Sequence, residues 1–436
     1  MKRFTGLRIL IVSDHYPPFI GGAHRQTQLL AHELLQRGHA VSVVTAWQPG
    51  LPVEQDDAGV TVYRLKEVRT SMAWLIQDRK QRHHPPYPDP ITAWGLRRLI
   101  NRFQPDIVHA HGWFSYSCAL ALLGKNIPLL ISTRDYGYSC ATRTLLYQDE
   151  TCSGPAPLKC TQCATQFYGV PKGPLAAFGV LAGRRLLLRK VKGIHSVSAY
   201  VQSIIQRDFL RESNAQLEKA DNPVDMKVIS SFLITEHEAP DEKLLAALPT
   251  QPYILFVGGL QLRKGLGTLL DAYQQLRAAP PLVLIGYDSL DTPSAFPAGV
   301  TVIRNASHAT VMAAWQRALF GVTPSVWPDP SPGVVREAMS MGKAVIGTNV
   351  GGTTEIILEG KTGLLVPPGD VVALANAMRK LIAQPELCDQ FGRAGRERAK
   401  EFRSEVSVPR FEQLYQQLVK EANGQLSQPD CLPIHK

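Results

Sequence analysis

The sequence has no long uncharged apolar run. Its most apolar stretch, residues 175–188, is interrupted by Arg184 and Arg185, so no segment reaches the roughly 18–20 residues that span a bilayer. Basic residues precede an apolar segment at the N-terminus, but that segment is short and no small-residue cleavage site follows it. We expect this segment to be a first strand and the protein to be cytoplasmic.

Cysteine and, in one region, acidic residues are also scarce. Seven cysteines in 436 residues are too few for a disulfide-dense secreted scaffold. Residues 151–207 contain no Asp or Glu, and residues 1–220 hold 27 basic against 15 acidic side chains. Such a face attracts anionic lipid, a phosphorylated substrate or nucleic acid, or is simply a solvated surface. No zinc-finger or RNA-recognition pattern supports nucleic acid, so we expect no nucleic-acid partner.

Apolar runs rich in Ile and Val alternate with stretches of helical periodicity. Predicted strands begin at Leu7, Val41, Val60, Asp106 and Pro128, and again at Tyr253, Pro281, Val300, Leu319, Lys343 and Gly363. Helices are predicted at Ala23–Arg37 and Ile91–Phe103. Near-continuous apolar strands between helices indicate parallel sheets covered on both faces. The sequence therefore predicts an α/β fold with two Rossmann-like, doubly wound parallel-sheet domains facing a central cleft.

The division of the chain follows from where this pattern stops and restarts. We predict an N-terminal acceptor-side domain over residues 1–200, an interdomain connection over 201–249 with a turn at Asn222-Pro223, and a C-terminal nucleotide-binding domain over 250–402. A helix over 403–423 should pack back towards the first domain, and residues 424–436 should form a flexible tail.

The strongest functional pattern lies in residues 324–370. Asp329 is in a Pro-rich loop, and Glu337 follows eight residues later in a helix that opens near Gly333. Carboxylates accept paired hydrogen bonds from vicinal hydroxyls, and a helix N-terminus attracts an anion. The alternative for an isolated acid pair is a solvated surface.

Two glycine-containing loops follow predicted strands and suit phosphate. In VGGLQLRKG, Lys264 offers a mobile point charge and Arg263 a planar fork. In YPPFIGGAHRQ, Gly21 and Gly22 permit close backbone approach at a helix start, and Arg25 falls just inside that helix. Either loop could instead be an ordinary basic loop or turn.

His109 and His111 lie on the same side of a strand end. No third metal ligand is evident nearby, so a hydrogen-bonding or core role competes with a site role.

The segment 324–370 resembles the nucleotide-sugar motif of the family 4 retaining glycosyltransferases, and most of the chain follows that family's order of motifs. The resemblance implies a GT-B fold, in which Glu337 holds the ribose and Asp329 contacts the donor sugar beside Gly333 and Val334. It also implies that Gly21, Gly22 and Lys264 contact the donor phosphates, that His111 faces the donor sugar, and that His109 is structural.

The sequence departs from this family in three places. Asp329 replaces a commoner Glu, Pro332 and its neighbours replace an aromatic-glycine pair, and Gly259 stands where the family has an arginine. We hypothesise that Arg263 supplies the charge lost at Gly259. With His111, Lys264 and Asp329, it completes the predicted catalytic set.

Four cysteines follow the predicted site: Cys140, Cys152, Cys160 and Cys163. Thiolates in fours favour tetrahedral Zn²⁺, whereas free cysteines or a redox pair are the alternatives. A subset of family 4 resembles this stretch; Asp135 and Tyr136 match it and Arg134 replaces its histidine. We assign Arg25, Asp135 and Tyr136 to the acceptor side, and predict a structural zinc.

Taken as a family 4 member, the protein should be a retaining glycosyltransferase that moves a sugar from a nucleotide diphospho-sugar to a glycan or a lipid-linked acceptor. The family needs no metal for catalysis. The alternatives are a non-catalytic nucleotide-sugar-binding subunit and a sugar-nucleotide epimerase; an oxidoreductase is disfavoured because no GxGxxG follows the first strand. An apolar helix candidate with a cationic end, residues 173–193, is typical of a membrane surface segment or of a buried helix. It leaves open a peripheral position on the inner face of the membrane.

Overall fold

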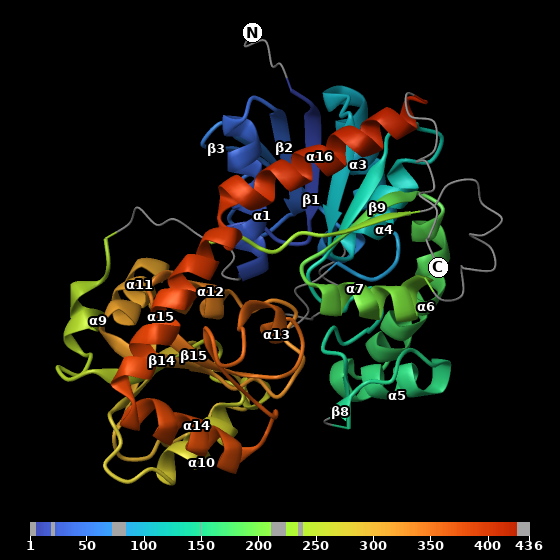
Figure 1. Ribbon diagram of the computed structural model, residues 1–436. Helices are drawn as coiled ribbons and strands as arrows, with labels where there is room; N and C mark the ends of the chain where they lie inside the picture. Colours follow the sequence, from blue (N-terminus) through green and yellow to red (C-terminus); the bar gives the residue numbers. More distant parts are fainter. Residues whose placement is uncertain are drawn as a thin grey trace, which may run out of the picture.

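The computed structural model describes residues 6–18, 22–71, 84–148, 150–210, 224–233 and 239–424. Gly21, the Asn222-Pro223 turn and the tail beyond residue 424 lie outside the described residues. The described chain forms two lobes, each built around its own sheet (Figure 1).

The first unit contains an eight-stranded sheet of order β10-β9-β6-β5-β1-β2-β4-β3. Its strands are β1 (Arg8–Ser13), β2 (Ala40–Ala46), β3 (Glu54–Asp57), β4 (Val60–Leu65), β5 (Ile107–His111), β6 (Leu129–Thr133), β9 (Val191–Ser196) and β10 (Asp225–Val228). All pairings are parallel except β3 with β4. The predicted strands at β1, β2, β4, β5 and β6 are confirmed.

Three strands of this sheet were not predicted, because they are short or rich in polar residues: β3, β9 and β10. Strand β10 pairs with β9, so the first sheet continues into the range assigned to the interdomain connection. It does so because pairing with a buried neighbour outweighs the polar character of the segment.

Helices cover both faces of the first sheet. They are α1 (Gly22–Gln36), α2 (Val68–Ser71), α3 (Pro90–Phe103), α4 (Phe114–Ala121), α5 (Pro157–Tyr168), α6 (Lys172–Leu188), α7 (Ala199–Ile205) and the π-helical turn η1 (Gln206–Leu210). The predicted helices at α1 and α3 are confirmed. A small hairpin of β7 (Leu146–Tyr147) and β8 (Glu150–Thr151) precedes α5. Helices α5 and α6 pack closely, since a Cβ at Gly173 would lie 2.4 Å from the Thr165 backbone.

The second unit is an all-parallel, six-stranded sheet of order β13-β12-β11-β14-β15-β16. Its strands are β11 (Tyr253–Val257), β12 (Leu282–Gly286), β13 (Val300–Arg304), β14 (Ala318–Thr323), β15 (Ala344–Thr348) and β16 (Gly363–Val366). Its helices are α9 (Glu242–Ala246), η2 (Leu262–Lys264), α10 (Leu266–Gln274), α11 (His308–Arg317), α12 (Gly333–Ser340), α13 (Thr353–Ile356), α14 (Val371–Ala383), α15 (Pro385–Ala399) and η3 (Lys400–Phe402). All six predicted strands of this unit are confirmed.

The last described helix, α16 (Ser404–Ala422), runs from the second unit across the first (Figure 1). Tyr415 on this helix is fully buried, and its hydroxyl lies 2.7 Å from Nδ1 of His109 in β5. Glu412 lies 2.9 Å from His39 Nε2. The helix is therefore fixed to the first unit by polar as well as apolar contacts.

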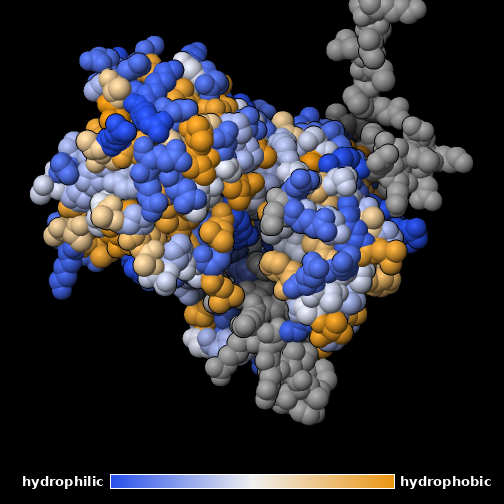
Figure 2. Space-filling model, turned by 90° about the horizontal axis from the view of Figure 1, so that it is seen from below, coloured by the Kyte–Doolittle hydropathy of each residue, from blue (hydrophilic) through white to orange (hydrophobic). Residues whose placement is uncertain are grey.

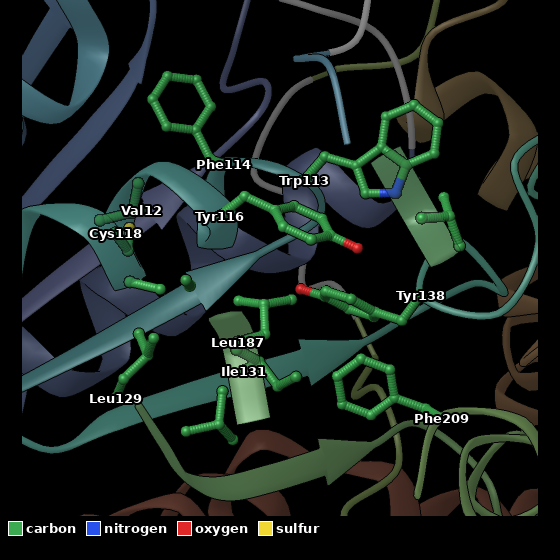
Figure 3. Close-up of a cluster of buried hydrophobic side chains, with 14 of the residues drawn as sticks. Val12, Trp113, Phe114, Tyr116, Cys118, Leu129, Ile131, Tyr138, Leu187 and Phe209 are labelled. Atoms are coloured by element: carbon green, nitrogen blue, oxygen red, sulfur yellow. The ribbon is translucent and has the colours of Figure 1, made fainter. Parts of the chain in front are cut away.

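Seen from below, the surface is hollowed between the two lobes (Figure 2). The core of the first unit contains a buried cluster of aromatic and aliphatic side chains (Figure 3). Tyr116 and Tyr138 lie side by side there and run in opposite directions, with Leu187 and Phe209 packed close by. The Tyr138 hydroxyl also donates to the Gly112 carbonyl at 2.8 Å, which links the loops that follow β6 and β5.

Candidate active site

A cavity of about 150 Å³ lies between the carboxyl ends of the two sheets. The first unit lines it with Gly22, Gln26 and Arg134, and the second with Gly333 and Glu337. In open parallel sheets this edge is where ligands bind, because strand ends leave backbone groups and loop side chains facing one crevice. The structure therefore brings Gly22, Gly333 and Glu337 to one cavity.

Lys264 and Asp329 form an ion pair beside this cleft. The Lys264 ammonium Nζ lies 2.5 Å from Asp329 Oδ2, and Asp329 is 6% exposed. The Gly352 N–H donates to the Asp329 carbonyl at 2.8 Å, which anchors the loop carrying the carboxylate. A cation and a carboxylate thus stand within one hydrogen bond of each other, from two loops far apart in sequence.

The position of Lys264 depends on a close backbone contact of the next residue. Gly265 has φ of +78°, and a Cβ there would lie 1.8 Å from the Pro324 carbonyl oxygen. The Val326 N–H also donates to the Arg263 carbonyl at 3.1 Å. Only glycine permits both the left-handed conformation and this approach.

Arg263 and Lys264 share one aromatic neighbour. Their charged groups lie 5.2 and 5.3 Å from the centre of the Trp327 ring. Arg263 is exposed, and its Nε donates to Gln261 Oε1 at 2.6 Å. The structure places Arg263 beside Lys264, as the hypothesis of charge replacement requires, and its role stays a prediction.

Glu337 lies on α12, one turn beyond the Gly333 and Val334 backbone. Its Oε1 is 3.2 Å from His308 Nε2 at the start of α11. Pro332 occupies the N-cap position of α12 and has no N–H to offer. His308 was not singled out from the sequence, because only the fold places α11 next to α12.

Arg336 is buried at the same cavity and was also missed. It is 3% exposed, lines the cavity, and donates to Ser331 Oγ at 2.8 Å and to the Ser331 carbonyl at 3.2 Å. Burial lowers the pKa of Arg336 to about 10, so the guanidinium is still charged at neutral pH. The sequence signal that could have identified Arg336 is a charged residue on the apolar face of an amphipathic helix.

Arg134 fixes the hydrogen-bonding state of His111. The Arg134 Nε donates to His111 Nδ1 at 3.2 Å, so that nitrogen is an acceptor and the proton must sit on Nε2. Burial holds the pKa of His111 well below its usual range. Within the described residues, His111 Nε2 is buried without a hydrogen-bond partner. His111 is thus a neutral imidazole that carries its proton on Nε2.

His109, by contrast, has both ring nitrogens engaged by protein groups. Its Nδ1 contacts the Tyr415 hydroxyl, and its Nε2 lies 2.6 Å from Ser132 Oγ. This arrangement agrees with the structural role predicted for His109.

The residues assigned to the acceptor side have different partners in the structure. Asp135 accepts hydrogen bonds from the Gly137 N–H at 2.8 Å and from Arg143 Nε at 2.9 Å, and Arg25 is half-buried on α1. Tyr136 is fully buried and donates to the Pro328 carbonyl at 2.6 Å. The Tyr136 hydroxyl therefore joins the two units, and its acceptor-side role stays a prediction.

Asp14, directly after β1, is a further buried carboxylate near the cleft. It accepts from the Phe114 N–H at 2.9 Å and lies 3.5 Å from Arg143 Nη1. Gly112, with φ of +67°, leaves the room that this carboxylate fills, since a Cβ there would lie 2.6 Å from Oδ2. A lone Asp after a first strand gave no signal in the sequence.

Asp14 should make the stability of the protein fall with rising pH. Burial raises the pKa of Asp14 from 3.8 to about 6. The stability that the protonated Asp14 carboxyl contributes to the fold is therefore full below about pH 4, and it is lost as the pH rises through about 6. Relative to Asp14→Asn, the wild type should lose roughly 3 kcal/mol of unfolding free energy between pH 4 and 7. Urea unfolding of both proteins at several pH values measures this; parallel pH profiles would contradict it.

The four cysteines predicted as a metal site lie away from this cleft. All four are free thiols that line a separate cavity beside α5. Within the described residues, no set of three or more carboxylate, imidazole or thiol groups is arranged to hold a metal ion.

Comparison with known proteins decides the family. The family model for a glycosyl transferase 4-like domain matches residues 21–217, and that for glycosyl transferases group 1 matches residues 241–398. The chain belongs to the GT-B glycosyltransferases of the family 4 type. It is therefore an enzyme of the glycosyltransferase class.

Relatives and solved structures agree with this assignment. The glycosyltransferase is 24% identical to a glycogen synthase of Mycobacterium tuberculosis over 418 residues, covering 90% of each chain. It is 23% identical to a GDP-mannose-dependent alpha-(1-6)-phosphatidylinositol monomannoside mannosyltransferase of Mycolicibacterium smegmatis, covering 89% of this chain and 92% of the relative. Its fold matches sucrose-phosphate synthase from Thermosynechococcus elongatus with a TM-score of 0.71 and 20% identity, over 95% and 100% of the two chains.

Proposed function

We propose that this glycosyltransferase moves a sugar from a nucleotide diphospho-sugar to a glycan or lipid-linked acceptor, with retention at the anomeric carbon. One observation carries the proposal: Glu337 lines the cavity between the two units, and Lys264, from a distant loop, pairs with Asp329 in the same segment as Glu337. A cation for the diphosphate and carboxylates for sugar and ribose hydroxyls are what donor recognition needs.

Each residue then has a role that its chemistry suits. Glu337 accepts hydrogen bonds from the ribose, Lys264 neutralises charge that develops on the departing diphosphate, and the His111 Nε2–H donates to a hydroxyl of the donor sugar. Arg263 adds charge beside Lys264. In a front-face displacement the leaving phosphate accepts the acceptor's proton, so no carboxylate nucleophile is assigned.

Replacing Glu337 with glutamine should weaken donor binding selectively. Hydrogen bonds to a charged group contribute about 1.5–3 kcal/mol, which corresponds to roughly a 10- to 150-fold increase in Kd. Wild-type protein is screened by thermal shift against UDP, GDP, ADP and CMP, alone and as sugar conjugates. A ligand at 100 times its Kd should add about 2.7 kcal/mol of stability.

Glu359→Gln is the matched control, because Glu359 is a carboxylate of the same unit whose Oε2 accepts from the Leu365 N–H outside the cavity. The control should keep the full donor-induced shift. A wild-type protein that binds a donor but never transfers or hydrolyses it would favour the non-catalytic binding subunit. Turnover of the donor to an epimer without acceptor would favour the epimerase.

The helical pair α5–α6 offers a surface suited to an anionic membrane. Apolar side chains are exposed along it: Leu158 at 88%, Phe167 at 60%, Val170 at 78%, Leu175 at 49% and Phe178 at 69%. No acidic residue occurs between Thr151 and Arg207. Apolar and hydrophilic side chains intermingle on the lobe that contains these helices (Figure 2). Among the described residues no helix is long and apolar enough to cross a bilayer.

We propose that this α5–α6 surface docks the enzyme on anionic lipid, where a lipid-linked acceptor is presented. Binding to liposomes with anionic headgroups should weaken with salt, since each basic residue contributes about 1 kcal/mol. Phe178→Ser combined with Phe167→Ser should reduce binding about tenfold or more, given about 25 cal/mol per Å² of apolar surface.

Trp94→Ser is the control, because Trp94 is 62% exposed on α3. Flotation of liposomes with and without anionic lipid measures the effect. Binding that is absent at every salt concentration, or equal in the α5–α6 variant and the wild type, would contradict docking at this surface.

A further inference from the structure

Four thiols from three separate segments meet at one small cavity in the first unit. Cys140 follows the loop after β6, Cys152 follows β8, and Cys160 and Cys163 lie on α5. The cavity has a volume of about 20 Å³. Because all four cysteines line it, side chains separated by up to 23 positions in the sequence have been brought to one place by folding.

Two of the four sulfurs lie together on α5. Cys160 and Cys163 are three residues apart on one helix, so their side chains lie on the same face. The Ala156 N–H donates to Cys160 Sγ at 3.3 Å, which partly offsets the burial that raises the pKa of this thiol. Lys159 also lines the cavity and adds positive charge nearby.

Among the residues that the structure describes, one carboxylate lines the cavity, and it is already paired. Among the lining residues the single acidic side chain is Asp208. Its two oxygens accept from Arg207 Nε at 2.6 Å and Nη2 at 2.9 Å. The four sulfurs are therefore the ligand set that this cavity offers to a metal.

We propose that Cys140, Cys152, Cys160 and Cys163 bind one structural Zn²⁺ ion as four thiolates. Soft sulfur ligands in fours select zinc in tetrahedral geometry, with Zn–S distances of about 2.3 Å. The sulfurs line the cavity without forming a ready metal-binding set, so zinc binding requires their side chains to turn inward from their present partners. Four protons leave as the ion binds.

The ion would brace α5 against the loop that follows β6. That loop contains Asp135 and its partner Arg143, and the Tyr168 hydroxyl of α5 already donates to the Ala141 carbonyl at 3.0 Å. Zinc would add a second and stronger link between the two segments. Removing it should loosen α5 and α6 without touching the donor cavity.

The first experiment is metal analysis of the full-length protein, purified without a histidine tag under reducing conditions. We expect about one equivalent of zinc per chain. Less than half an equivalent of zinc, iron in its place, or a disulfide between any two of the four cysteines by non-reducing mass spectrometry would overturn the proposal.

Variants then test the ligands. Cys163→Ser and Cys160→Ser should lose most of the zinc, whereas Cys388→Ser should keep it. Cys388 is a matched control because it is a half-buried cysteine on α15, where its Sγ donates to the Leu381 carbonyl at 3.3 Å. Zinc retained by both α5 variants would overturn the proposal.

Cobalt substitution keeps the test decisive if the variants do not fold. Metal-stripped wild-type protein titrated with Co²⁺ should show the visible bands of a tetrahedral site and thiolate charge-transfer absorption, saturating at one equivalent. A spectrum typical of octahedral oxygen ligation would overturn the proposal. Because donor-induced thermal shifts are measured separately, failure of the zinc site would leave the proposed transfer activity untouched.

Discussion

Replacing Lys264 with methionine should lower kcat by about 10²–10³-fold, the loss seen when one group that stabilises developing negative charge is removed. Lys264 is the cation paired with Asp329 at 2.5 Å in the interdomain cleft. Methionine keeps much of the side-chain length and apolar stem but has no charge to place on the departing diphosphate. Donor turnover at saturating donor and acceptor measures the effect.

The loss of turnover must be separated from any loss of folding stability that the same substitution causes. Removing Lys264 leaves the buried Asp329 carboxylate without its partner, and an unpaired buried charge destabilises a fold. The double variant Lys264→Met with Asp329→Asn should recover thermal stability without recovering turnover. If the double variant recovers turnover, Lys264 acts only by neutralising Asp329.

Arg263→Ala tests the hypothesis that Arg263 replaces the arginine absent at Gly259. Arg263 is exposed and near the same Trp327 ring as Lys264, so its loss should weaken donor affinity with little change in stability. Unchanged donor affinity in Arg263→Ala would rule out this replacement.

Replacing Gly265 with alanine should abolish the donor-induced thermal shift and lower the melting temperature. The left-handed conformation alone costs a non-glycine residue about 1–2 kcal/mol. The new Cβ would also lie 1.8 Å from the Pro324 carbonyl oxygen. The loop carrying Lys264 must therefore move away from residues 324–327, and the ion pair with Asp329 cannot keep its geometry.

Gly267→Ala is the matched control for this substitution. Gly267 lies two residues further along in α10, and its Cβ would meet only Leu262 Cδ2, at 3.4 Å. An alanine inside a helix should be neutral or slightly stabilising there. Differential scanning fluorimetry with and without donor compares the two variants. Equal behaviour of the two would show that the Gly265 contact does not hold Lys264 in place.

Apolar runs were enough to predict the two parallel sheets, and spacing was enough to place the acidic pair at one loop and helix start. Strands buried on both faces must be almost wholly apolar, so β1, β5, β11 and β15 stood out. Asp329, Gly333 and Glu337 lie within nine positions of one another, and their spacing alone places them at one loop and helix start. Local chain geometry was enough for these features.

The contacts across the cleft and between neighbouring strands could not be predicted from the sequence, because they depend on the tertiary structure. The contact that fixes the His111 proton joins the last residue of β5 to Arg134, which follows the adjacent strand β6. The Tyr136 hydroxyl donates to the Pro328 carbonyl of the opposite unit. Packing also decided three features that were not predicted from the sequence. These are the burial of Arg336, the contact of His308 with Glu337, and the pairing of β10 with β9. Hydrogen bonds and ion pairs form between groups close in space, and residues far apart in the chain become neighbours only once both sheets have formed.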